Sequence, residues 1–113
     1  MKDLTKRVAI RSDAIRKAAE DECCTWPGCG VQDKSVVFAN SNMSIHGKAG
    51  GRKAEDVFGA FLCGSHHSLY DVEPRGQASS SDNLNKEWHF MRAMSATWLR
   101  LISLGIITVK GMK

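Results

Sequence analysis

Two pairs of side chains have the types and spacing of zinc ligands. Cys24 and Cys29 lie in the stretch CTWPGC with the spacing C-x4-C, and Cys63 precedes two adjacent histidines. A structural zinc site holds four tetrahedral nitrogen or sulfur ligands. The sequence therefore predicts a Cys3His zinc site built from Cys24, Cys29, Cys63 and one of His66 or His67.

The turn inside the first pair supports this prediction. Pro27-Gly28 is a strong turn signal that folds Cys29 back towards Cys24. Cys23 competes with Cys24, but two adjacent side chains do not easily point at one ion, so Cys23 is assigned to packing. Histidines beside the cysteines of a chain without secretion features favour a metal over disulfides.

The two histidines can have different roles. His66 completes the spacing C-x2-H after Cys63 better than His67 does. Adjacent side chains on a helix diverge by about 100°, so the pair can serve two sites. His67 is then either a ligand elsewhere or a solvent-exposed neighbour.

A polar, Gly-rich loop separates the ligand pairs. It carries three polar side chains that could take part in chemistry, which are Asn40, Asn42 and His46. Three basic residues follow, which are Lys48, Arg52 and Lys53. The loop is too polar for a core and has no phosphate-loop pattern. We expect its basic residues to contact the phosphate backbone of a nucleic acid.

The elements that must position these residues follow from the apolar patterns. Residues 35–39 and 56–62 are apolar runs that predict two strands, and a helix is expected from His66. The order strand, loop, strand, helix makes residues 24–71 a ββα unit. A short helix is predicted from Ser12 or Asp13 to about Glu22, with Ser12 as N-cap. The expected fold is α+β, a small zinc-braced ββα core with an N-terminal helix and a long C-terminal helix.

The C-terminal helix is predicted over residues 83–104. Ser81 or Asp82 is its expected N-cap, and Gly105 is a good residue to end it. Apolar residues at three- and four-residue steps predict its core face. They are Leu84, Trp88, Met91, Met94 or Ser95, Trp98, Leu101 and Ile102. Residues 72–82 are expected to form a loop, His89 a surface histidine, and 106–109 a short terminal strand.

Composition limits the remaining possibilities. A chain of 113 residues fits one domain, 1–113, and its low aromatic content of 7% suits a core that a metal helps to hold. The charge of +4 is compatible with a polyanionic partner, and residues 1–9 read as a basic arm. No run approaches the ~18 apolar residues of a membrane span, and the N-terminus lacks a signal-peptide pattern. We therefore expect a cytoplasmic protein with no membrane contact.

Three stretches carry a resemblance to a known family. They are IRKAAEDECCTWPGC, VVFANSN…HGKAGGRKAEDVFGAFLCGSHHSLYD and the closing LISLGIITVK. Over nearly its whole length the chain resembles the YbcO-like family of nucleases encoded by lambdoid prophages and phages, in the HNH, or ββα-metal, superfamily. The resemblance implies a structural Zn²⁺ held by Cys24, Cys29, Cys63 and His66. It also implies His67 as a ligand of a catalytic Mg²⁺ or Mn²⁺.

The chain departs from this family at one position. The family usually reads Ala-His-Ser-Asn where this chain reads Ala39-Asn40-Ser41-Asn42. If the family's histidine is the general base, Asn40 cannot replace it, because an amide has no useful basicity near neutral pH. Either His46 is the working base, or Asn40 marks a weakened or lost activity. The candidate catalytic residues are therefore Asn40, Asn42, His46 and His67.

The leading hypothesis is a metal-dependent DNA endonuclease of a phage recombination or replication module, acting in the cytoplasm of a bacterial host. Phosphate contacts position such an enzyme without reading sequence, so low sequence specificity is expected. The alternative is a non-catalytic, zinc-stabilised module that binds DNA or RNA. A third hypothesis is a small zinc protein that binds another phage protein through its C-terminal helix.

Overall fold

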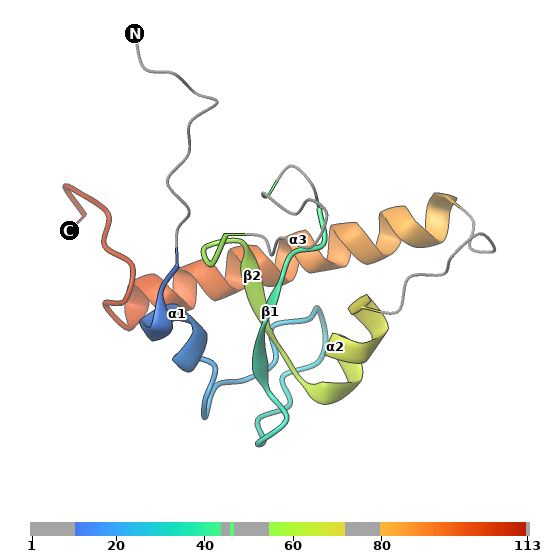
Figure 1. Ribbon diagram of the computed structural model, residues 1–113, viewed down its shortest axis with the longest axis horizontal. Helices are drawn as coiled ribbons and strands as arrows, with labels where there is room; N and C mark the ends of the chain where they lie inside the picture. The colour runs from blue at the N-terminus through green and yellow to red at the C-terminus, as the bar shows by residue number, and fades with distance from the viewer. Residues whose placement is uncertain (1–10, 44–45, 47–54, 72–79, 113) are drawn as a thin grey trace, which may run out of the picture.

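The computed structural model describes residues 11–43, 46, 55–71 and 80–112, and for 80–84 the backbone alone. In chain order the elements are α1 (Asp13–Lys17), β1 (Val37–Asn40), β2 (Gly59–Leu62), α2 (Gly64–Asp71) and α3 (Ser80–Ser103). Figure 1 shows the two strands in front of the long helix α3. The arm at 1–9 and the basic residues Lys48, Arg52 and Lys53 lie outside the described residues. The α+β class and the order of these elements agree with the sequence prediction.

The two strands form an antiparallel hairpin whose register runs from Val37 opposite Leu62 to Asn40 opposite Gly59. Every residue of β2 is buried, because α3 covers this strand while β1 pairs with its edge. Gly59 allows the strands to lie this close, since a Cβ there would meet the ring of Phe38 and lie 2.7 Å from the carbonyl oxygen of Ala39. The hairpin therefore fixes where β1 ends and α2 begins.

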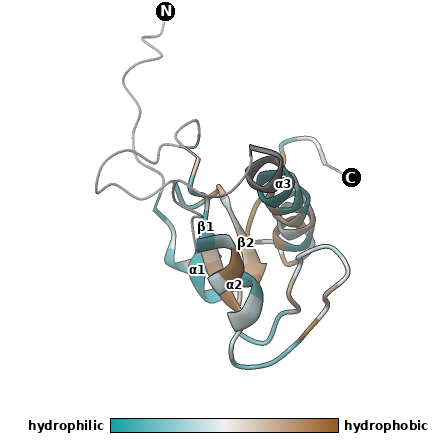
Figure 2. Cartoon of the chain, turned by 90° about the vertical axis from the view of Figure 1, so that its right-hand side faces the viewer, coloured by the Kyte–Doolittle hydropathy of each residue, from teal (hydrophilic) through white to brown (hydrophobic). Residues whose placement is uncertain are grey.

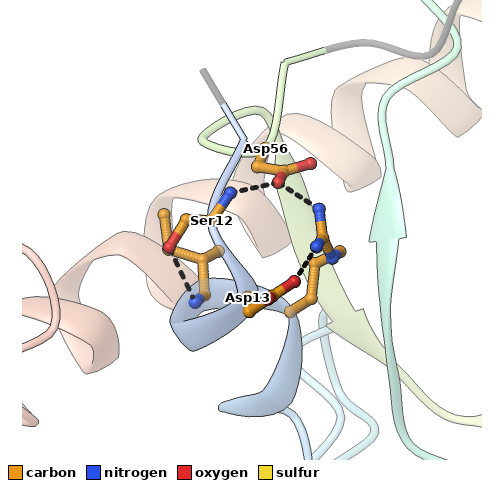
Figure 3. A network of polar contacts seen from close by, with 5 residues as sticks. Ser12, Asp13 and Asp56 are labelled. Atoms are coloured by element: carbon orange, nitrogen blue, oxygen red, sulfur yellow. Dashed lines mark hydrogen bonds and ion pairs between the residues drawn. The ribbon is translucent and has the colours of Figure 1, made fainter.

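The second strand is shorter than the predicted run 56–62. Asp56 is 2% exposed, and its carboxylate accepts hydrogen bonds from the backbone N–H of Ser12 (2.5 Å) and the guanidinium of Arg16 (2.6 Å). Figure 3 shows this network, in which Arg16 also contacts Asp13. The turn at Asp56 serves to anchor α1, and regular pairing begins only at Gly59.

The first helix is also shorter than expected. Ser12 is its N-cap as predicted, with its hydroxyl accepting from the N–H of Ile15 at 3.2 Å. The helix ends at Lys17 and not near Glu22, because turns follow and Asp21 adopts φ +67°. A left-handed residue cannot continue a right-handed helix. The chain thereby turns towards the cysteine pair.

Helix α3 packs across β2 through a face that coincides only in part with the predicted one. Figure 2 looks nearly along α3 and shows it on one side of the hairpin. The buried residues of this face are Phe90, Ala93, Met94, Thr97 and Leu101. Met94 and Leu101 were predicted correctly, as was Trp98, which is partly buried against the core. The prediction was wrong for Trp88 and Met91, which are 57% and 37% exposed.

The end of α3 follows the predicted chemistry. Gly105 has φ +76°, its N–H donates to the Ile102 carbonyl, and the N–H of Ile106 donates to the Leu101 carbonyl. These two bonds define a Schellman motif. The expected strand at 106–109 is wrong, because Ile107 also donates to the Leu101 carbonyl and the chain continues in turns. The helix begins at Ser80, before the expected caps. Within the described residues no helix has the length and apolar content needed to cross a membrane.

Candidate metal centre and adjoining polar cluster

Four side chains meet where the cysteine turn, the end of β2 and the start of α2 come together. The ligand atoms of Cys24, Cys29, Cys63 and His66 all lie within 4.8 Å of one another. Cys63 Sγ lies 3.3 Å and Cys24 Sγ lies 3.7 Å from His66 Nδ1, and Cys29 Sγ lies 3.9 Å from Cys63 Sγ. Tetrahedral zinc with its usual bond lengths separates its ligands by about 3.5–3.8 Å. The cluster therefore has the donor set and dimensions of a zinc site.

Local backbone bonds shape the cysteine turn. The Cys29 N–H donates to the Trp26 carbonyl at 2.9 Å, and the Cys24 N–H donates to the Val31 carbonyl at 2.7 Å. Gly28 has φ +82°, a conformation that glycine adopts without steric cost. The predicted Pro-Gly turn thus brings the first two thiols to one point.

The other two ligands come from the hairpin and its helix. Cys63 follows the last residue of β2, and His66 lies in the first turn of α2. The N–H of Gly64, the first residue of α2, donates to Ser35 Oγ at 2.9 Å. The hairpin and α2 are therefore held in the orientation that closes the cluster.

The thiols differ in their electrostatics. Burial raises the pKa of Cys24 to about 12. Burial also opposes ionisation of Cys63, but backbone N–H groups of Ser65 and His66 and the neighbouring thiols outweigh it and lower its pKa. Without a cation Cys24 therefore holds its proton more firmly than Cys63 does. A divalent metal would supply the charge that allows several thiolates to share this space.

The structure decides between the alternative ligands that the sequence left for each pair. All four cysteines are free thiols, so none of them is used in a disulfide. Cys23 is exposed and lies outside the cluster, whereas Cys24 is buried within it. Of the two histidines only His66 joins the thiols, while His67 Nε2 lies 2.9 Å from Asp71 Oδ2.

An aromatic stack supports the ligating imidazole. The indole of Trp26 lies parallel to the His66 ring with centroids 5.2 Å apart, and it also stacks with His89 of α3 at 5.6 Å. His89 is half-buried, and its Nδ1 lies 2.7 Å from the carbonyl oxygen of Asn85. His89 is partly exposed, which agrees in part with the predicted surface position, and its ring also packs on Trp26 beside the centre.

A second polar cluster begins at His67, the residue of α2 that follows His66. Asp71, the last residue of α2, contacts His67 and also accepts from the side-chain amide of Asn42 at 3.5 Å. The backbone N–H of Asn42 donates to the Tyr70 hydroxyl at 2.7 Å, which fixes the loop after β1 against α2. The structure thus joins two predicted residues, Asn42 and His67. It adds Asp71, whose only sequence signal is its position four residues after His67.

The other two candidate residues are Asn40 and His46. Asn40 ends β1, and its buried side-chain nitrogen has no hydrogen-bond partner among the described residues. His46 is 7% exposed, with Nδ1 2.5 Å from the Ser41 hydroxyl oxygen and its ring stacked on Phe58 at 4.5 Å. Burial lowers the pKa of His46. The contacts of His46 within the described part of the chain do not include His67 or Asp71.

The two clusters have different chemical capacities. The Cys3His cluster offers four protein ligands, which fill a tetrahedral coordination sphere and leave no position for substrate. His67, Asp71 and Asn42 are half-buried or exposed and offer nitrogen and oxygen donors beside solvent. A search against protein-family models, curated proteins and solved structures found no match for the chain.

Proposed function

We propose that the chain is a metal-dependent DNA endonuclease of the HNH, YbcO-like kind, which hydrolyses phosphodiester bonds. The observation that carries this proposal is the cluster of His67, Asp71 and Asn42 directly beside a closed Cys3His site. A hairpin and helix braced by one metal would hold a second, open set of donors at a fixed place. This arrangement is what a hydrolytic site needs, since metal catalysis requires open coordination positions.

The first metal in this proposal is a structural Zn²⁺. Three thiolates and one imidazole suit zinc, and four protein ligands exclude substrate. The Trp26 ring against His66 would limit rotation of the imidazole and keep its ligating nitrogen turned to the thiols. The role of this site is to hold Cys63 and α2 in place, which positions His67.

The second metal is Mg²⁺ or Mn²⁺, held by His67 and Asp71. An imidazole beside a carboxylate fits Mn²⁺ better than Mg²⁺, which prefers oxygen ligands alone. When bound, such an ion stabilises charge on a phosphoryl oxygen and on the leaving group. The side-chain amide of Asn42 would orient the Asp71 carboxylate. The Tyr70 hydroxyl would keep Asn42 at this position through its backbone.

The mechanism also needs a general base that activates the attacking water. Asn40 occupies the position at which the family usually has histidine, and an amide does not accept a proton near neutral pH. His46 is the other candidate, but its Nδ1 is already bound to Ser41 and its ring is buried against Phe58. We therefore propose that His46 stabilises the loop and that the cleavage rate is low.

These same observations favour a second function, a zinc-stabilised module that binds nucleic acid without cutting it. In both cases the basic arm and Lys48, Arg52 and Lys53 would contact phosphates, with little sequence specificity. From the resemblance to prophage nucleases we propose that either function belongs to a phage recombination or replication module inside a bacterial cell.

Nicking of supercoiled plasmid with added Mn²⁺ tests the first function. We expect slow nicking that is lost in His67→Ala and Asp71→Asn and retained in Asp21→Asn, a matched carboxylate in an exposed turn. Asn40→His should raise the rate, and His46→Ala should not abolish it. A salt-dependent gel shift without nicking would support the binding module instead. If the chain neither nicks the plasmid nor shifts it in a gel, both proposals are refuted.

A further inference from the structure

Helix α3 has a second apolar face, which stays largely exposed in the part of the chain that the structure describes. Phe90, Thr97 and Leu101 point into the core and are fully buried. About 160–180° around the helix from Phe90 lie Trp88 and Leu99, which are 57% and 70% exposed. Among the residues of α3 whose side chains the structure describes, five form this outer stripe, which are Trp88, Met91, Ser95, Leu99 and Ile102.

The spacing of the outer stripe is symmetric about its centre. Met91 and Leu99 lie four residues on either side of Ser95, and Trp88 and Ile102 lie seven. A helix that runs antiparallel to α3 and crosses it at Ser95 therefore presents the same pattern in reverse. The stripe is complementary to itself, which is the requirement for a two-fold contact between identical chains.

Side-chain size and surface shape fit the same arrangement. A small residue, Ser95, stands at the crossing point, where two helices approach most closely. An open hollow of about 570 Å³ lies beside Trp88 and Met91, with Asn85 and Glu87 as further lining residues in the described chain. The two-fold arrangement places the most exposed apolar side chain of the stripe, Leu99 of the second copy, opposite Met91 at this hollow.

Charge does not oppose this contact. The outer stripe contains no charged residue. Arg92 flanks the stripe, and its guanidinium lies over the Trp88 ring at 4.8 Å from the ring centroid. This cation–π contact holds the Arg92 side chain along the helix surface. The two copies of Arg92 would lie six residue positions apart, about 9 Å along the axis, and salt screens charges at that distance.

We propose that the outer stripe of α3 is the interface of an antiparallel homodimer with its two-fold axis at Ser95. From Trp88 to Ile102 the stripe spans 14 residue steps, or about 21 Å, which is short for an interface that must bury the ~800 Å² per partner of a standard complex. The dimer is therefore weak and forms in a concentration-dependent way, with a dissociation constant in the micromolar range or above.

Sedimentation equilibrium across a range of concentrations up to millimolar tests this interface. The wild-type chain should shift from monomer to dimer as concentration rises. Leu99→Glu, carried by both copies, should raise the dissociation constant about tenfold or more. Leu69→Glu is the matched control, because Leu69 is 52% exposed on α2 and lies outside the stripe. Equal melting temperatures would show that both variants fold.

Disulfide trapping tests the orientation in a Cys23→Ser background, which removes the exposed native thiol. Mixed Met91→Cys and Leu99→Cys chains should form the heterodimer disulfide in preference to either homodimer. A parallel helix pair would give the homodimers instead. A chain that stays monomeric at every concentration, a dimer that Leu99→Glu leaves intact, or a parallel pattern would each overturn the proposal. None of these results depends on nuclease activity.

Discussion

Removing zinc should lower the stability of the whole fold, because the Cys3His cluster joins the cysteine turn, the end of β2 and the start of α2. At free zinc about 100 times its dissociation constant, binding contributes about 2.7 kcal/mol to unfolding free energy. For 113 residues the entropy of unfolding is about 0.24 kcal/mol per kelvin. The expected loss of melting temperature on chelation is therefore about 11 °C.

Thermal melts followed by circular dichroism at buffered free zinc measure this effect. Each tenfold rise in free zinc above the dissociation constant adds about 1.4 kcal/mol, or about 6 °C. Cys29→Ser should remove most of the dependence, and Cys23→Ser should keep all of it, because Cys23 is exposed outside the cluster. A melting temperature that ignores free zinc, or an equal effect of the two variants, would refute the reasoning.

Three further predictions concern the elements that support the site. Thr97→Val leaves the buried N–H of Phe61 without its acceptor at 3.1 Å and should cost about 1–3 kcal/mol in a urea titration; a change near zero would contradict this. Burial is the largest cause that raises the pKa of Tyr70, the single tyrosine, from 10.0 to about 12. Because the unfolded chain loses this proton at a lower pH than the folded chain, the free energy of unfolding falls as pH rises from about 10 to 12. Tyrosinate absorbance should therefore appear near pH 12 in the native chain and near 10 in denaturant, and a native midpoint near 10 would refute the burial argument. Gly59→Ala places a methyl group against the ring of Phe38 and should lower the free energy of unfolding by about 1–3 kcal/mol, which a urea titration shows as a lower midpoint. An unchanged midpoint would show that the strands can separate to make room.

The four residues of the Cys3His cluster could be predicted from the sequence because the signal is local. Cys24 and Cys29 are separated by a Pro-Gly turn, and Cys63 and His66 by one turn of helix. Short spacings of this kind determine which side chains can meet whatever the rest of the fold does. The antiparallel hairpin then had to bring the two pairs together, and it does so through the β1–β2 register.

The core face of α3 could not be predicted in the same way. Periodicity counts Thr97 as polar, but it is fully buried because its hydroxyl is within 2.9 Å of Thr25 Oγ1 and accepts from the N–H of Phe61. The apolar pattern also contained two stripes, and a count of apolar residues mixed them. Trp88 was assigned to the core because nothing in the sequence distinguishes the face that meets β2 from the face that meets solvent.

The second cluster was only partly visible in the sequence. Asn42 was a candidate from the polar loop and His67 from the adjacent histidines, and the family resemblance gave His67 its metal role. Asp71 was missed because a single carboxylate on a helix resembles an ordinary solvated charge. Its contact with His67 depends on the length of α2, and its contact with Asn42 on how the loop after β1 packs on Tyr70. Such tertiary contacts have no fixed sequence spacing.

Crystals grown with zinc and soaked in Mn²⁺ would test the central claim most directly, because anomalous scattering at the two absorption edges identifies each metal. The account predicts zinc among Cys24, Cys29, Cys63 and His66, and manganese at His67 and Asp71. Zinc absent from the first cluster, or a single ion that takes His67 together with the cysteines, would contradict the division into a structural centre and a working one.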